Sequence, residues 1–150
     1  MRSIFIFFAS LPVCAQTLQI SPVTGARGDE VVVNISLDVP SAQSPSVLQW
    51  DTIFPAQLLE VSGAGPEAAR AVIDAGKSLA CAKRQPYSYT CLLAGGRASI
   101  PNGTIATIRF KIRATAETAS SALRIEKAEG ATADLRKITI PDAQASVTVR

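Results

Sequence analysis

Residues 106–113 of the chain read Ala-Thr-Ile-Arg-Phe-Lys-Ile-Arg. Small or apolar side chains alternate with polar ones at every step, which is the period of a strand with one buried face and one exposed face. A helix would instead bring apolar side chains together at every third and fourth position. The stretch therefore predicts a half-buried β-strand.

The same alternation recurs on both sides of this strand. It is clear in residues 31–38, 123–126 and 145–150. Shorter apolar runs lie between these segments, at residues 17–20, 47–54, 58–61, 78–81, 87–93 and 135–140. Turn signals rich in glycine and proline separate the runs. Strands at such regular spacing predict an all-β sandwich of two sheets.

One segment departs from the strand pattern. Residues 66–76 begin with Pro66, carry alanines in the middle and end with Gly76. Proline is favoured in the first turn of a helix and glycine just after the last turn. We therefore expect one short helix near residues 66–75, between two strands.

Residues 1–15 have the pattern of a secretory signal, with a basic start and an apolar run at residues 4–13 that is too short to span a bilayer. We expect this segment to be cleaved, so that residues 16–150 form the mature domain. A lipid anchor at Cys14 is disfavoured, because Val13 stands where a lipoprotein signal carries a smaller residue. The predicted location is extracellular or at the cell surface, with the periplasm as the alternative.

The composition argues against several kinds of active site. The chain has no histidine, which rules out a Ser-His-Asp triad, a Cys-His pair and a histidine-bearing zinc site. Its acidic residues are scattered, and it carries neither a Gly-x-Ser-x-Gly elbow nor a phosphate-binding glycine loop. A net charge of +3, mixed along the chain, gives no case for nucleic acid. We therefore expect no enzyme, no metal site, no cofactor and no membrane span.

Two cysteines, Cys81 and Cys91, remain after the expected cleavage. They stand ten positions apart with Pro86 at the midpoint, which has the symmetry of a hairpin. In a secreted chain this spacing favours a disulfide between the two arms. A redox pair or two metal ligands are the alternatives, although the spacing is not Cys-x-x-Cys and no further ligand is evident.

Three blocks of the sequence together resemble the cohesin domain. Residues 25–37 (GARGDEVVVNISL) resemble the family's Gly-Asp turn and the long alternating strand that follows it. Residues 48–61 (LQWDTIFPAQLLEV) resemble its aromatic strand, proline-bearing turn and next strand, and residues 101–112 (PNGTIATIRFKI) resemble a third strand. Because the blocks occur in the family's order and spacing, the resemblance covers roughly residues 17–150.

The resemblance implies a jelly-roll β-sandwich of about nine strands in two antiparallel sheets, a fold that cohesins share with certain cellulose-binding modules. It also implies a non-catalytic module that grips a dockerin on another secreted protein across a flat sheet face, in assemblies that break down polysaccharide. By alignment, Gln49 stands where dockerin-binding members present Asp or Asn, and Asp51 follows on the same strand. Phe54 directly precedes Pro55, so the family's usual Asp before that proline is not matched. The expected partner is a dockerin-type or other secreted protein.

Two further groups of side chains are candidates for partner binding. Arg109, Lys111 and Arg113 form a basic stripe along the exposed face of one strand, which suits either docking of an acidic partner or protection of an edge strand from pairing. Tyr87 and Tyr89 alternate on one face and, if both were exposed, would form a platform for a sugar ring. We expect one tyrosine in the core and the other partly exposed.

Two alternative functions therefore stay open beside the cohesin-like one. The first is a carbohydrate-binding module with polysaccharide as its ligand, for which the two tyrosines would be the binding surface. The second is a structural assembly module of the cell envelope that has no discrete ligand.

Overall fold

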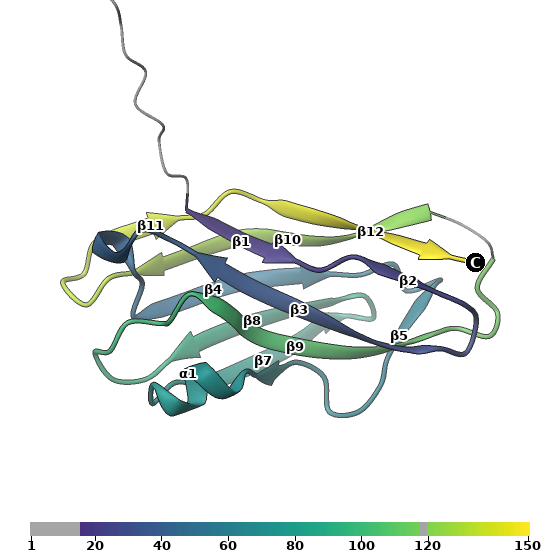
Figure 1. Ribbon diagram of the computed structural model, residues 1–150, viewed down its shortest axis with the longest axis horizontal. Coiled ribbons are helices and arrows are strands. Elements are labelled where there is room, and N and C mark those ends of the chain that lie inside the picture. The colour runs from purple at the N-terminus through teal and green to yellow at the C-terminus, as the bar shows by residue number, and fades with distance from the viewer. Residues whose placement is uncertain (1–15, 118–119) are drawn as a thin grey trace, which may run out of the picture.

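A computed structural model describes residues 16–117 and 120–150 of the chain (Figure 1). The expected signal segment, with Cys14, lies outside the described residues. The described strands are β1 (Thr17–Ile20), β2 (Val23–Gly25), β3 (Glu30–Asp38), β4 (Val47–Ile53), β5 (Leu59–Val61), β6 (Glu67–Ala68), β7 (Ser78–Gln85), β8 (Ser88–Ala94), β9 (Gly103–Ile112), β10 (Ser120–Ala131), β11 (Lys137–Thr139) and β12 (Ala143–Val149).

These strands form two sheets that pack face to face. Sheet A has the order β1-β3-β9-β5, and β6 also pairs with β9. Sheet B has the order β2-β12-β10-β4-β8-β7, and β11 also pairs with β10. In the view of Figure 1, β3 and β9 cross in front of β4 and β8. The predicted two-sheet sandwich is confirmed. Eight of the described strands have four or more residues, and β2, β5, β6 and β11 are shorter pieces.

One strand pair corrects the expectation of two purely antiparallel sheets, because β2 runs parallel to β12. The cause is that the N-terminal segment changes sheets at Pro22, which has no N–H to continue the ladder of β1 with β3. Ser21 closes that ladder, since its N–H donates to the Asn34 carbonyl at 3.0 Å and its hydroxyl accepts from the Asn34 N–H at 2.9 Å. The segment then pairs with the edge of sheet B.

The core lies between the sheets, where alternate side chains of each strand meet. On β9 the period-two prediction is confirmed: Ile108, Phe110 and Ile112 are buried, while the arginine and lysine between them are exposed. The Phe110 ring packs against Phe54 with centroids 5.1 Å apart. Trp50 of β4 is fully buried, and its indole N–H donates a hydrogen bond to the hydroxyl of Thr52. The polar atom of this large side chain is therefore paired inside the core.

The predicted short helix is α1 (Arg70–Asp74), which starts a few residues after Pro66 because β6 occupies the positions between them. Gly76 follows the C-terminal cap of the helix, and its φ of 81° lies in the left-handed region that favours glycine. The Gly76 N–H donates to Ile73 at 2.9 Å and the Lys77 N–H donates to Val72 at 2.9 Å, which is a Schellman ending. Within the described part of the chain, no helix is long and apolar enough to cross a membrane.

Cys81 and Cys91 face each other on the hairpin of β7 and β8. Cys81 lies directly opposite Cys91 in the strand register, their Cα atoms are 4.1 Å apart, and a disulfide joins them. The predicted bridge is therefore present. It connects the edge strand β7 to its one neighbour in sheet B.

Reduction of this disulfide should lower the free energy of unfolding by roughly 2–3 kcal/mol, because the bridge closes a short loop in the unfolded chain. Urea denaturation of the oxidised and the reduced protein, followed by the fluorescence of Trp50, measures the difference. Mass spectrometry provides the control, since reduction of one bridge adds about 2 Da. Free thiols in the untreated protein, or equal unfolding free energies before and after reduction, would contradict this expectation.

Candidate functional site

Each sheet leaves one outward face, and the two faces differ in their chemistry. The outer face of sheet A carries the basic stripe of β9. Lys111 lies directly between Glu30 of β3 and Glu60 of β5 in the strand register. The guanidinium of Arg113 lies 3.4 Å from the Glu60 carboxylate and donates to the carbonyl of Ala56 at 2.7 Å. Acidic side chains on neighbouring strands therefore balance much of the stripe's charge.

The position of β9 also excludes one reading of the stripe. β9 pairs with β3 on one side and with β5 and β6 on the other, so it is an inner strand of sheet A. Protection of a free edge therefore cannot be the reason for Arg109 and Lys111. The outer face of sheet A is therefore a solvated face of mixed charge. It includes one large apolar side chain of the described residues, Val32, which is 49% exposed and lies opposite Arg109.

The outer face of sheet B is built from rows of side chains that cross four strands. In one row Leu92 of β8 stands between Ala80 of β7 and Gln49 of β4, and Glu129 of β10 follows Gln49. Leu92 is 41% exposed. The strand register thus places Leu92 and the predicted binding residue Gln49 side by side, on the two inner strands of this row.

The next row along the same strands is polar. The Thr90 hydroxyl donates to the Asp51 carboxylate at 2.8 Å and accepts from the Arg84 guanidinium at 3.4 Å. Glu126 lies opposite Asp51 and is paired with Arg124, whose guanidinium is 3.0 Å from the Glu126 carboxylate. Asp51 is therefore held in a fixed position by its neighbours on the same face.

A shallow hollow of about 290 Å³ adjoins the apolar row, and Val47, Leu92 and Leu135 are among the side chains that line it. Leu135 is 87% exposed. It belongs to the turn between β10 and β11, and its φ of 66° lies in the left-handed region, which is strained for a residue with a Cβ. The chain thus presents an apolar side chain to solvent from an unfavourable backbone conformation.

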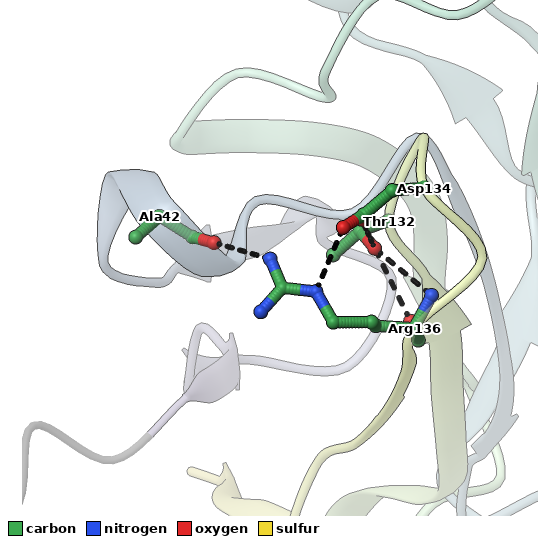
Figure 2. A network of polar contacts seen from close by, with 4 residues as sticks. All are labelled: Ala42, Thr132, Asp134 and Arg136. Carbon is green, nitrogen blue, oxygen red and sulfur yellow. Dashed lines mark hydrogen bonds and ion pairs between the residues drawn. The ribbon is translucent and has the colours of Figure 1, made fainter.

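Figure 2 shows the polar contacts that hold this turn. The Thr132 hydroxyl donates to the Asp134 carboxylate and accepts from the Arg136 N–H at 3.1 Å. The Arg136 guanidinium pairs with Asp134 at 3.0 Å and also donates to the Ala42 carbonyl at 3.3 Å, in the short helical turn η1 (Ser41–Gln43). Above all the hydrogen bond from Thr132, and then the contacts with Arg136, lower the pKa of Asp134 despite partial desolvation. The turn therefore has a defined conformation.

The two tyrosines have different surroundings. Tyr89 points toward the core side of sheet B, where its ring stacks on Phe54 with centroids 6.3 Å apart and its hydroxyl lies close to Gly65. Tyr87 is 44% exposed in the turn between β7 and β8. The two rings therefore do not form one exposed platform, and Tyr87 lies beside the polar row of Asp51 rather than beside Leu92.

The predicted site residues fall on opposite sides of the molecule. Gln49 and Asp51 lie on the outer face of sheet B, whereas Arg109 and Lys111 lie on the outer face of sheet A. Leu135 was missed as a site residue, because the apolar run of residues 135–140 suggested a strand that in fact covers only β11. The Thr-Ala-Asp sequence just before it is a turn signal that would have indicated the loop. Among the described residues no group of histidine, cysteine, aspartate or glutamate is placed to hold a metal ion.

Replacement of Leu135 by glycine should raise the free energy of unfolding by about 1 kcal/mol, because glycine adopts a positive φ without strain and little packing is lost at this exposed position. Urea denaturation measures the change. Lys127 is the matched control, since it is exposed and also has a positive φ, of 52°. Lys127→Gly should shift stability in the same direction, whereas a marked loss of stability in Leu135→Gly would show that the leucine supports the fold.

No model of a known protein family matches this chain, and no curated protein matches it by sequence. Solved structures do match it. The sixth cohesin of scaffoldin B from Acetivibrio cellulolyticus, solved in complex with a dockerin, is 18% identical, with a TM-score of 0.76 over 91% of this chain and 99% of that one. An OlpA cohesin from Clostridium thermocellum, also solved with a dockerin, is 17% identical, with a TM-score of 0.77 over the same shares.

A non-cellulosomal cohesin from the archaeon Archaeoglobus fulgidus is 12% identical, with a TM-score of 0.74 over 91% of each chain. These similarities extend over nearly the whole described domain. The chain therefore has the cohesin fold, as the resemblance of its sequence implies.

Proposed function

We propose that this chain is a non-catalytic module that binds another secreted protein, of the dockerin type, through the outer face of sheet B. Two of the similar cohesins are solved in complex with dockerins. The disulfide between Cys81 and Cys91 is typical of an oxidising compartment and supports secretion, as does the leader pattern of residues 1–15. A role in extracellular polysaccharide breakdown belongs to the same proposal.

The observation that carries the proposal is the conformation of Leu135. Strained backbone that the surrounding structure holds in place is found preferentially where a protein functions. Here the strain positions an apolar side chain in solvent, where it contributes no burial to the fold. Burial of Leu135 and the nearby Leu92 in a partner would give the contact its hydrophobic centre.

The polar groups around these leucines fit the rim of such a contact. Protein interfaces combine an apolar centre with hydrogen-bonding side chains at the periphery. Gln49 lies beside Leu92, and no hydrogen bond of its amide is found among the described residues, whereas Asp51 is already oriented by Thr90. We therefore assign Gln49 and Asp51 to the docking face. Arg109 and Lys111 lie on the other sheet, so a single partner domain that rests flat on sheet B does not reach them.

The carbohydrate alternative has less support. A planar polysaccharide surface is bound by aromatic rings that lie exposed together, and here the ring of Tyr89 packs on Phe54. Tyr87 alone would offer one ring. An assembly module without a discrete ligand makes a different prediction, because it would self-associate rather than bind a separate domain.

Binding measurements on the dockerin modules encoded by the same organism test this proposal. Each dockerin is immobilised, and the affinity of the folded chain is measured by surface plasmon resonance. Leu92→Asp and Leu135→Asp should each weaken binding at least about tenfold, since a buried charge would replace a central apolar contact. Val32→Asp is the matched control, because Val32 is a similarly exposed apolar residue of a central strand on the opposite face, and it should leave the affinity unchanged.

Two outcomes would contradict the proposal. If Val32→Asp abolishes binding while both leucine variants bind normally, the partner docks on sheet A instead. If no dockerin binds and the chain sediments as an oligomer that either leucine substitution dissociates, the face serves self-association. Circular dichroism of each variant shows whether it remains folded.

A further inference from the structure

Lys77 is a buried cation held only by backbone carbonyls in the described structure. Lys77 is only 3% exposed. The other buried polar residues of the described chain, Thr52 and Thr132, are uncharged. The Lys77 ammonium donates to the carbonyls of Ser46 at 2.8 Å, of Gly95 at 2.6 Å and of Gly96 at 3.5 Å. None of the ion pairs found among the described residues includes it.

These carbonyls come from three neighbouring strand ends. Lys77 directly precedes β7, Gly95 directly follows β8, and Ser46 directly precedes β4. Because β7, β8 and β4 are antiparallel neighbours in that order, all three positions lie at the same end of sheet B. The ammonium group therefore ties together the ends of three of the four strands that form the proposed docking face.

The backbone around Lys77 is shaped for this contact. The Schellman ending of α1 delivers Lys77 at the start of β7. A Cβ on Gly95 would lie 2.7 Å from the carbonyl oxygen of Gly76, so only glycine allows these two segments to approach so closely. Gly95 also has a φ of 135°, which a side chain would disfavour. The carbonyl that forms the 2.6 Å contact is thus presented by a residue that has to be glycine.

Three carbonyl acceptors around one nitrogen match a donor with three N–H bonds. A primary ammonium group supplies three, whereas a neutral amine has only two and would direct its lone pair at one carbonyl. Methionine has a similar length and supplies none. Burial lowers the pKa of Lys77, as expected when a charge leaves water, and the three charge-assisted hydrogen bonds oppose that cost. The three carbonyls therefore suit a cation of the alkylammonium class.

We propose that the carbonyls of Ser46, Gly95 and Gly96 form a binding site for a primary ammonium ion, that Lys77 fills this site from within the chain, and that its occupation fixes the ends of β4, β7 and β8 beside the apolar part of the docking face. Removal of the side chain beyond Cβ then leaves a site for a free alkylammonium ion. The final step, an effect on partner binding, rests on the proposed function, whereas the ammonium site itself does not.

Chemical rescue of Lys77→Ala tests this site. The substitution removes Cγ, Cδ, Cε and Nζ, and n-propylammonium contains the equivalent atoms. Hydrogen exchange is followed by NMR at the Ser46 N–H, which donates to Ala131 at 2.8 Å, and at the Ile100 N–H, which donates to Pro45 at 2.8 Å. The Ser62 N–H of sheet A, which donates to Arg109 at 2.8 Å, is the remote control. Parallel samples contain 1-propanol or tetramethylammonium, which lack the three N–H donors.

The variant should exchange the Ser46 and Ile100 amides at least about tenfold faster than the parent, with the Ser62 amide unchanged, because only one end of sheet B has lost its anchor. Propylammonium at about 50 mM should restore most of the protection, as expected for a weak millimolar site. Propanol and tetramethylammonium should not. Equal rescue by propanol, or unchanged exchange in the variant, would overturn the proposal, because either result means that the side chain only fills space.

Lys77→Met provides a second test that holds even if Lys77→Ala folds poorly. Methionine fills the space of the lysine side chain without donating a hydrogen bond, so both amides should exchange faster and propylammonium should not slow them. Parent-like protection in Lys77→Met would overturn the proposal. If Lys77→Ala folds only when propylammonium is present, that also supports the site. All these measurements use the protein without a partner. A negative result would therefore rule out the ammonium site and not the docking face, and an absence of dockerin binding would rule out the docking face and not the ammonium site.

Discussion

The packing of sheet A on sheet B, into which the inner strands β9 and β4 each bury alternate side chains, is the interaction on which the rest of this structure depends. Every second side chain of these strands is buried there, including Phe110 of one and Trp50 of the other. Phe54, just after β4, joins them through its contact with Phe110. Because successive residues of a strand point to opposite faces, burial of one set fixes the other set on the outside. The two outer faces, and the residues available on each, follow from this parity.

Much of the architecture could be predicted because it depends on this local period. The alternation of residues 106–113 predicts which side chains of β9 are buried, and Pro66 with Gly76 predicts a short helix. The features that could not be predicted depend on contacts distant in the sequence. The parallel pair of β2 and β12 requires both sheets to be in place, and the central position of β9 depends on its pairing with segments on both sides. The exposure of the basic stripe could be predicted from the alternation, whereas the acidic residues that lie beside it, Glu30 and Glu60, could not, because they belong to other strands.

The candidate site shows the same division. Gln49 and Asp51 could be selected from the aligned strand, but their proximity to Leu92 follows only from the register of β4 with β8. The role of Leu135 could not be predicted, because it belongs to an apolar run of the sequence and hydrophobicity does not indicate which residue adopts a positive φ. Lys77 looks like an ordinary surface lysine in the sequence, and only the convergence of three strand ends buries it. Side chains whose roles depend on three segments at once are the ones that a single sequence conceals.

The central claim is that the partner rests on the outer face of sheet B. Hydrogen exchange of the chain with and without a dockerin that it binds in the affinity measurements tests this most directly, because it maps the covered surface without any substitution. Binding should slow exchange in β4, β8 and β10 and in the turn that carries Leu135, and it should leave β3 and β9 unchanged. Slower exchange confined to β3 and β9, on the outer face of sheet A, would contradict it.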